Sequence, residues 1–273
     1  METKKLERII ILILALLNLF LLLVVLADWS QERSSKSETR RRLTLLLEAE
    51  GIRVGDGAEL LQSCPAQCTV VRDLEMERRR VRGILGEHSA EDLGGSIWFY
   101  ASSAGQMRIR GTGEMDLLLT GGGAYRGQSP EQTARALLAA GGIPLVEDSA
   151  WPQDPEAGLS LCCAWNGFPV YNAVLRVDYS RDKLDLLTGT VVFNRETALD
   201  AQAGMDSVSV LTRFLDLVRR EELPCSVLLG ISPGYYQSVA VSGEGVLTPV
   251  WRIHTDSGDY DINAVTGRPE NLS

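Results

Sequence analysis

The feature that most constrains this chain is an apolar run from Ile9 to Ala27, interrupted by the single polar residue Asn18. A helix rises about 1.5 Å per residue, so a run of this length crosses roughly the 30 Å hydrocarbon core of a bilayer. We therefore expect residues 9–27 to form a transmembrane helix. A cleaved signal peptide is the alternative, because Val25-Leu26-Ala27 loosely fits a cleavage site, but the length of the run favours retention.

Basic residues flank this run on both sides, so the charge count by itself does not orient it. They are Lys4, Lys5 and Arg8 before it and Arg33, Lys36, Arg40, Arg41 and Arg42 after it. A short tail carries no domain, whereas a long C-terminal domain can translocate largely regardless of its charges. We expect a single-pass protein of the cell membrane with a cytoplasmic N-terminus and an extracellular C-terminal domain.

Composition excludes several classes of protein. The net charge of −9 makes the chain repel phosphate, and no basic stripe offsets it, so nucleic acid is not expected as a partner. The 45% hydrophobic and 23% charged content excludes collagen-like and wholly disordered chains. Five cysteines and two histidines are too few for a zinc ribbon or a dense disulfide scaffold.

Local patterns divide the chain after the apolar run. A charged stretch leads into a leucine-rich helix ended by Gly51. Ser129-Pro130-Glu131-Gln132 is a helix start with a capping box, and the stripe from Val208 to Val218 predicts a second helix that stops before Pro224. The expected segments are a cytoplasmic tail (1–8), a transmembrane helix (9–27), a stalk and helix (28–50), a strand-rich region (51–125) and two helix-plus-sheet units (126–200 and 201–273).

The two units have the same order, a helix followed by strands, and share a short motif. Pro169-Val170-Tyr171 recurs as Pro249-Val250-Trp251. Helices separated from hairpin-connected strands, without a βαβ rhythm, are typical of the α+β class. We expect an α+β fold with one N-terminal transmembrane helix and an extracellular domain of antiparallel sheets with packed helices, possibly as two degenerate repeats.

The same architecture and several motifs resemble the YycI/YycH-type regulatory proteins, which accompany the WalK-type sensor histidine kinase of Gram-positive bacteria. The basic tail, the apolar span with its Asn and the charged stalk carry part of the resemblance. The motifs that carry the rest are Asn166-Gly167-Phe168-Pro169-Val170-Tyr171, Leu175-Arg176-Val177, Pro249-Val250-Trp251-Arg252-Ile253 and Tyr260-Asp261-Ile262-Asn263-Ala264-Val265-Thr266-Gly267. The last of these is also similar to PepSY-like domains.

The resemblance implies a non-enzymatic, membrane-anchored accessory regulator of a two-component system for cell-wall homeostasis. Its membrane helix and extracellular domain would contact the sensor histidine kinase and a YycH-type sister protein, without a cofactor. A PepSY-like exported inhibitor or ligand-binding module is the alternative in the binding class. A membrane-anchored cell-wall hydrolase is the alternative among enzymes.

No residue pattern supports catalysis. Ser180-x-x-Lys183 matches a nucleophile motif of penicillin-binding proteins, but it occupies an apparent hairpin turn and its companion motifs are missing. His88 and His254 have no nucleophile or second ligand at motif spacing. We therefore expect no catalytic residue.

Candidate metal, phosphate and disulfide sites have equally plain alternatives. Asp259, Asp261, Asn263 and Glu270 have calcium-loop spacing, but Ala264 stands where such a loop needs glycine, so a strand face is expected. Gly121-Gly122-Gly123 lacks the end of a phosphate loop. The disulfide state stays open for Cys64, Cys68, Cys162, Cys163 and Cys225, with one side chain of the Cys162-Cys163 pair expected to face inward and one outward.

Asn18 is the one polar side chain inside the apolar run. An amide in hydrocarbon gains roughly 0.5 to 2 kcal/mol by hydrogen bonding to a partner helix. Helical spacing places Ala15, Leu22 and Val25 on its face, so Ala15, Asn18, Leu22 and Val25 are the expected helix–helix contact.

Overall fold

The computed structural model describes residues 37–120, 129–147, 159–180, 183–192, 194–197 and 202–270. Helical residues 37–49 come first. The other elements are, in chain order, β1 (Arg53–Val54), β2 (Cys68–Arg72), α2 (Leu74–Leu85), β3 (Ser89–Asp92), β4 (Ile97–Ala101), β5 (Gly105–Arg110), β6 (Glu114–Leu119), α3 (Pro130–Ala140), β7 (Leu159–Trp165), β8 (Phe168–Ser180), β9 (Lys183–Thr190), β10 (Asn194–Thr197), α4 (Ser207–Arg219), β11 (Val227–Val239), β12 (Glu244–Thr255), β13 (Gly258–Asn263) and β14 (Pro269–Glu270).

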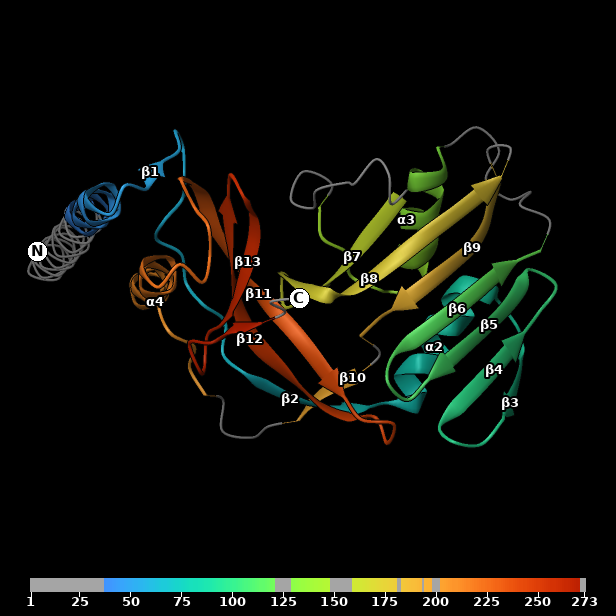
Figure 1. Cartoon of the computed structure of the whole chain (residues 1–273). Helices are drawn as coiled ribbons and strands as arrows, with labels where there is room; N and C mark the ends of the chain where they lie inside the picture. The colour runs from blue at the N-terminus through green and yellow to red at the C-terminus, as the bar shows by residue number, and fades with distance from the viewer. Residues whose placement is uncertain are drawn as a thin grey trace, which may run out of the picture.

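The strands of the described residues belong to one 14-stranded sheet whose main path is β10-β2-β12-β11-β8-β9-β6-β5-β4-β3. Figure 1 shows two lobes along this path. The α4 lobe comprises β1, β2, β10 to β14, helical residues 37–49 and α4, and the α2/α3 lobe comprises β3 to β9 with α2 and α3. The lobes meet where β8 runs parallel to β11, with Val170 opposite Tyr235.

Several elements follow directly from local sequence signals. Ser129 caps α3 with the expected capping box, in which its hydroxyl accepts from the N–H of Gln132, and the helix ends at Gly141. Flanking turn residues predict a strand at 114–119, and alternation predicts one at 159–165; β6 and β7 have these bounds. The sequence pattern predicts two short strands, at 226–230 and 235–241, but the structure has one long strand, β11, which continues through Pro233.

Helix α2 is a correction to the expected strand-rich region at 51–125. Asp73 caps it by accepting from the N–H groups of Glu75 and Met76. Its buried face includes the charged residue Glu77 beside Val81 and apolar neighbours. Half of its twelve residues are charged, so the segment lacks the apolar content that marks a buried helix in the sequence.

Each lobe buries one face of its strands under helices. In the α4 lobe, Leu47 and Phe214 pack in one cluster with Trp251 and Ile253 of β12. The Trp251 side chain is fully buried, and its Nε1–H donates to the carbonyl of Met205 at 2.8 Å, so it loses no hydrogen bond on burial. In the α2/α3 lobe, α2 and α3 cover the strands of β5 to β9 (Figure 1).

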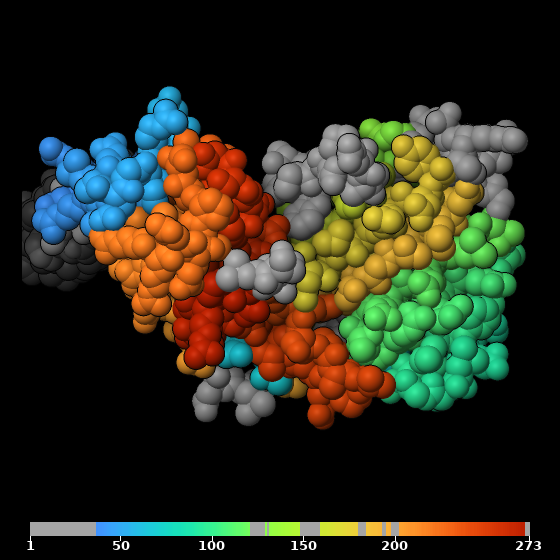
Figure 2. Space-filling view, viewed as in Figure 1, coloured from blue at the N-terminus to red at the C-terminus, as the bar shows by residue number. Residues whose placement is uncertain are grey.

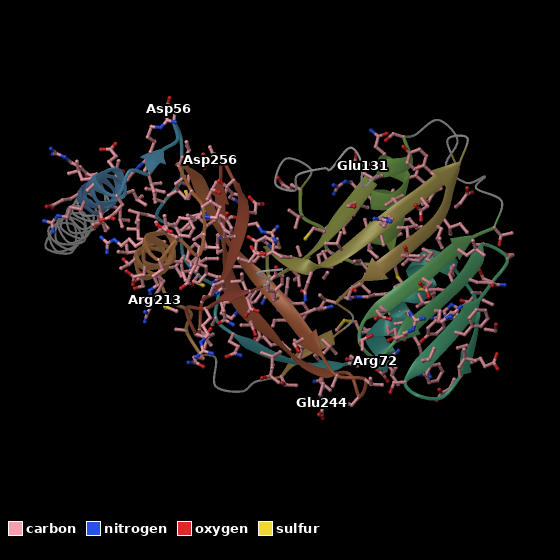
Figure 3. All side chains as sticks on the ribbon, in the orientation of Figure 1. Asp56, Arg72, Glu131, Arg213, Glu244 and Asp256 are labelled. Atoms are coloured by element: carbon pink, nitrogen blue, oxygen red, sulfur yellow. The ribbon has the colours of Figure 1, made fainter. Side chains whose placement is uncertain are left out.

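A buried ion pair ties β2 to α2 and β4. Arg72, labelled in Figure 3 near the start of α2, donates through Nε and Nη2 to the two oxygens of Glu77, at 2.7 and 2.9 Å. The Tyr100 hydroxyl donates to the same carboxylate at 2.8 Å, and Arg72 Nη1 donates to the carbonyl of Ser96 at 2.6 Å. Because every charged atom has a partner, this pair can remain in the core.

The expected fold class is wrong. The protein is mostly sheet, and its strands form one mixed sheet rather than separate antiparallel ones, because β1 and β8 both pair in parallel with β11. Within the described residues, no helix is long and apolar enough to cross a membrane. Residues 9–27, on which the transmembrane expectation depended, lie outside the described residues, as does the tail at 1–8. The pairings that unite the sheet join segments far apart in the sequence, and local hydrophobic periodicity does not predict such pairings.

The two expected helix-plus-sheet units each contain a helix followed by an antiparallel meander. α3 precedes β7, β8 and β9, and α4 precedes β11, β12 and β13. The shared Pro-Val-aromatic motif lies in the second strand of each meander, in β8 and β12. The division into units at 126–200 and 201–273 stays a prediction.

Candidate ligand-binding cleft

The polar face of the α4 lobe is built by strand alternation. Along β12, Trp251 and Ile253 point into the core, so Arg252 and His254 point to the opposite face. The β11–β12 register places Ser232 opposite Arg252, and the β12–β13 register places Asp259 opposite His254 and Asp261 opposite Arg252. Three strands thus bring two parallel rows of polar side chains to one surface.

One row forms a continuous hydrogen-bonded chain. Ser232 Oγ lies 2.9 Å from His254 Nε2, and His254 Nδ1 lies 2.8 Å from Asp259 Oδ1. An ionised carboxylate only accepts, so His254 carries a proton on Nδ1. This hydrogen bond lowers the pKa of Asp259, against the opposing effect of its partial burial.

The second row is centred on an arginine. Arg252 donates through Nε and Nη2 to both oxygens of Asp261, each at 2.7 Å, and the hydroxyl of Tyr236 also donates to Asp261. Burial lowers the pKa of Arg252, but the hydrogen bonds and negative charge of Asp261 outweigh it and raise the pKa above its ordinary value. The guanidinium also lies over the Tyr171 ring, 3.9 Å from its centroid.

Tyr171 reaches this surface from the other lobe. It lies in β8, and its hydroxyl is 3.0 Å from both the carbonyl and the Oγ of Ser232. Burial raises the pKa of Tyr171, so the hydroxyl stays protonated and donates. Tyr171 therefore connects the two lobes through Ser232, the serine of the hydrogen-bonded row.

A cavity of about 530 Å³ opens between the lobes at this point. On the face seen in Figure 2, the molecule narrows where the orange and red strands meet the yellow ones. The cavity is lined by Gln62, Leu145, Val146, Glu147, Ala164, Gly167, Phe168, Pro169, Tyr171, Ser232, Pro233, Arg252 and His254. Its volume suits a small molecule or the end of a peptide.

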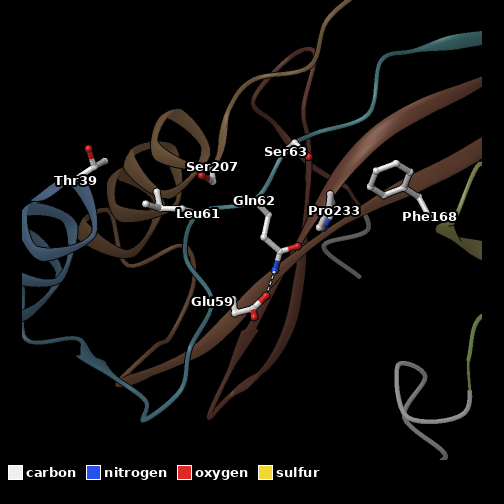
Figure 4. Close-up of a pocket in the computed structure, with 8 residues that line it drawn as sticks. All are labelled: Thr39, Glu59, Leu61, Gln62, Ser63, Phe168, Ser207 and Pro233. Atoms are coloured by element: carbon white, nitrogen blue, oxygen red, sulfur yellow. Dashed lines mark hydrogen bonds between the residues drawn. The ribbon is translucent and has the colours of Figure 1, made fainter. Parts of the chain in front are cut away.

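A second cavity, of about 620 Å³, shares part of its lining with the first. Gln62, Phe168 and Pro233 line both. Figure 4 shows Phe168 and Pro233 on one side of this second cavity, with Gln62 donating to Glu59 nearby. The two cavities are therefore neighbours, and we refer to the first, which Ser232 and His254 line, as the cleft.

The Ser232–His254–Asp259 distances match those of a catalytic triad, but the surroundings of the serine do not. Acyl transfer needs hydrogen-bond donors for the developing oxyanion, and in α/β-hydrolases one of them is the N–H of the residue after the nucleophile. Here that residue is Pro233, which has no N–H. Ser232 also lies within a continuous strand, so it lacks the exposed turn that such nucleophiles occupy.

The other sequence candidates for catalysis are Ser180 with Lys183, and His88. Ser180 and Lys183 are paired at the β8–β9 hairpin, which agrees with the expected turn. His88 is half-buried, and its Nδ1 lies 2.8 Å from the carbonyl of Gly86. His254 lies in β12, in the strand that its alternation with Trp251 and Ile253 predicts, and its side chain belongs to the Ser232–His254–Asp259 row.

The calcium-loop spacing does not produce a cation site. Asp259, Asp261 and Asn263 do share a strand face as expected, but Asp259 binds His254 and Asp261 binds Arg252. Asn263 Nδ2 donates to Glu270 at 2.7 Å. Among the described residues, no group of three or more His, Cys, Asp or Glu side chains can hold a metal ion. The Gly121-Gly122-Gly123 stretch lies outside those residues.

All five cysteines are free thiols. Cys162 and Cys163 are both buried, so the expectation that one faces outward is wrong. A register irregularity in the β7–β8 ladder lies at this pair, and Leu145 bridges to Cys163. Burial raises the pKa of Cys163 to about 12.

The proposed helix–helix contact cannot be placed in the fold. Ala15, Asn18, Leu22 and Val25 lie outside the described residues, so this contact stays a prediction.

Comparison with known proteins finds solved structures that are similar to this chain. No family model matches the chain. No curated protein matches it either. A solved structure of an uncharacterized protein from Eubacterium rectale is similar at 11% identity, with a TM-score of 0.44, over 81% of this chain and 90% of that one.

Proposed function

We propose that the chain is a non-enzymatic accessory regulator of a sensor histidine kinase, and that the cleft between its lobes is a binding site rather than an active site. The observation that carries the second part is Pro233, which follows Ser232 and supplies no N–H to an oxyanion. The kinase and a YycH-type sister protein as partners come from the resemblance of the motifs. Asn166 to Tyr171, which belong to those motifs, form the β7–β8 turn and the strand that borders the cleft.

Partner identity is tested by purifying the tagged full-length chain from membranes and identifying the bound proteins. We expect the sensor kinase and a sister protein in the wild-type eluate. The control is the same chain with Ala at Asn166 and Phe168, two motif positions that are not in the buried core. A protease as the recovered partner would favour the PepSY-like inhibitor instead, and recovery of neither kinase nor sister protein would overturn the proposal.

The location at the cell membrane, with the domain outside, remains a proposal from residues 9–27. Fractionation of cells tests it, because the intact chain should sediment with membranes, and protease added to intact cells should remove the domain. Recovery of the chain mainly from the medium would contradict it.

A membrane-anchored hydrolase is a second candidate, and one observation favours it. The 2.9 and 2.8 Å separations in the Ser232–His254–Asp259 chain are those of an activated serine. A fluorophosphonate probe decides between the two functions. We expect the probe to label the wild type no more than it labels Ser232→Ala. Labelling of the wild type that is lost in Ser232→Ala would establish Ser232 as a nucleophile.

A further inference from the structure

The second cavity contains a buried hydroxyl group that has no partner. Ser207, the first residue of α4, lines this cavity of about 620 Å³ and is only 3% exposed. Its side chain forms no hydrogen bond with any described residue. Because buried polar groups normally have hydrogen-bond partners, this hydroxyl is suited to bond a molecule that enters the cavity.

Further polar groups line the same cavity. The hydroxyls of Thr39 and Ser63 are also without a partner in the described part of the chain. Gln62 donates through Nε2 to a backbone carbonyl at 2.8 Å and to Glu59 at 3.3 Å, so its Oε1 remains an acceptor (Figure 4). The cavity therefore offers hydroxyls that donate and accept beside a carboxylate and an amide oxygen that accept.

The charge around the cavity disfavours an anionic ligand. Among the described residues that line it, Glu59 is the one charged side chain. At the start of α4, the carboxylate of Asp206 accepts from the N–H of Ser209 at 2.7 Å, so the positive end of the helix dipole already has its anion. The other polar groups are hydroxyls and an amide, which favour an uncharged ligand.

One side of the cavity is apolar. Phe168 and Pro233 lie together there, and Leu61 lines the cavity near α4 (Figure 4). The Phe168 ring meets the Tyr235 ring edge to face, with the centroids 6.2 Å apart, and this contact holds it in position. A ligand that fills the cavity therefore needs apolar C–H surface as well as hydroxyls.

The neighbouring edge of β11 is closed to an extended peptide. The N–H of Ile231 donates to the carbonyl of Glu59, and the carbonyl of Ile231 accepts from Gln62 Nε2. Pro233, which lines the cavity, has no N–H. A peptide therefore finds no free backbone here to which it can add as a strand, and recognition depends on side chains.

We infer that the second cavity binds a neutral saccharide. Its hydroxyls bond Ser207, Glu59 and Gln62. A C–H face of a sugar ring packs against Phe168 and Pro233. A sugar combines both kinds of surface, because its hydroxyls donate and accept while its C–H groups are apolar. The volume of the cavity suits a small saccharide. This inference goes beyond the accessory role proposed above and does not depend on the kinase as partner.

Saturation-transfer NMR titration of the full-length chain tests this inference. The chain is placed in phosphatidylcholine nanodiscs, because glycoside detergents would supply sugars of their own, and empty nanodiscs are the blank. The probes are cellobiose, maltose and N,N′-diacetylchitobiose, with sorbitol as an acyclic polyol and N-acetyl-trialanine amide as a peptide. We expect at least one disaccharide to bind, and sorbitol and the peptide to bind at least about tenfold more weakly, since neither presents hydroxyls on a rigid ring.

The charge of the lining gives a second test. For the disaccharide that binds, the uronic acid form carries a carboxylate in place of one CH2OH group. This acid should bind at least about fivefold more weakly than the neutral sugar, because like charges repel at Glu59. Glu59→Gln should reduce that difference, whereas Glu48→Gln, exposed and not in the lining, is the control that should keep it.

A pair of serine variants locates the site. Ser207→Ala should weaken binding of the disaccharide by about three- to tenfold, because one hydrogen bond to the sugar is lost. Ser209→Ala, exposed in the same turn of α4 and not in the lining, is the matched control that should bind like the wild type. Ser207→Ala breaks no hydrogen bond within the described residues, and thermal melting of each variant shows that it is folded.

The inference is overturned if no disaccharide binds, if sorbitol or the peptide binds as tightly, or if the uronic acid binds as well as the neutral sugar. Wild-type binding by Ser207→Ala, or an unchanged preference for the neutral sugar in Glu59→Gln, would overturn it as well. Failure of the proposed function is distinguishable. Saccharide binding without kinase recovery contradicts the kinase partner, and kinase recovery without saccharide binding contradicts the ligand.

Discussion

Removal of the Glu77 carboxylate tests the buried ion pair that links β2, α2 and β4. Glu77 is 0% exposed and the Arg72 side chain is 7% exposed, so neither charge can be solvated if its partner is lost. Glu77→Ala leaves the Arg72 guanidinium with the Ser96 carbonyl as a remaining acceptor and leaves the Tyr100 hydroxyl without its carboxylate. Breaking one side of a buried pair costs about 3–5 kcal/mol.

This cost is a large part of the stability of a domain, which is typically about 5–15 kcal/mol. For a chain of this size it corresponds to a fall in Tm on the order of 10 °C. Burial, and then the charge of Glu77, raise the pKa of Tyr100, so its hydroxyl remains a donor and Tyr100→Phe should cost about 1.5–3 kcal/mol. Urea unfolding followed by tryptophan fluorescence measures both.

Two further variants separate the ion pair from general effects on α2. Glu75→Ala, exposed in the first turn of the same helix, should cost less than about 1 kcal/mol. Arg72→Met combined with Glu77→Leu removes both charges and should recover much of the loss. The reasoning is refuted if Glu77→Ala changes the free energy of unfolding by less than about 1 kcal/mol, or if the double variant is no more stable than Glu77→Ala.

Three other predictions follow from single positions. Gly83→Ala should destabilise the fold by about 1–3 kcal/mol although alanine favours helices, because the new Cβ would overlap the Ala140 carbonyl. Gly230→Ala is the control: no atom lies within 4 Å of its new Cβ, so the free energy of unfolding in urea should change by less than about 1 kcal/mol. Hydrogen bonds from Met76, then from Glu75, lower the pKa of Asp73 below 3.8, so its charge stabilises the fold above that pH and this contribution should disappear as the pH falls through the folded pKa. The free energy of unfolding, measured at pH 7, 4 and 3, should therefore fall less with acid in Asp73→Asn than in the wild type. Cys163, with a pKa raised to about 12 by burial, should resist maleimide at pH 8 until urea unfolds the chain, and rapid labelling of the native chain would contradict its burial.

Short-range signals predicted the elements that depend on neighbouring residues. The capping box at Ser129, the turn residues that flank β6 and the alternation of β7 located those elements, because caps, turns and strand periods act within a few residues. Helix α2 escaped prediction because the partner that makes Glu77 a core residue, Arg72, belongs to another element. The interior carboxylate has no apolar signature in the sequence.

Part of the cleft was within reach of the sequence. The two-residue turn Asp256-Ser257 between β12 and β13 places His254 opposite Asp259. A two-residue hairpin turn fixes the register of its strands, so this pair can be predicted from the sequence. The position of Ser232 beside His254 depends on the register between β11 and β12. The sequence did not predict it, because Pro233 indicated a break between residues 230 and 235, where β11 in fact continues.

The sequence by itself determined the caps, the strand faces and the charge balance, because these follow from residues close together in the chain. Only the tertiary structure decided that Tyr171 of β8 meets Ser232 of β11, through a parallel pairing at Val170 and Tyr235. The two residues are 61 positions apart, and parallel strands are not joined by a short turn whose sequence would predict their pairing. The cleft exists because that pairing joins two separately packed cores.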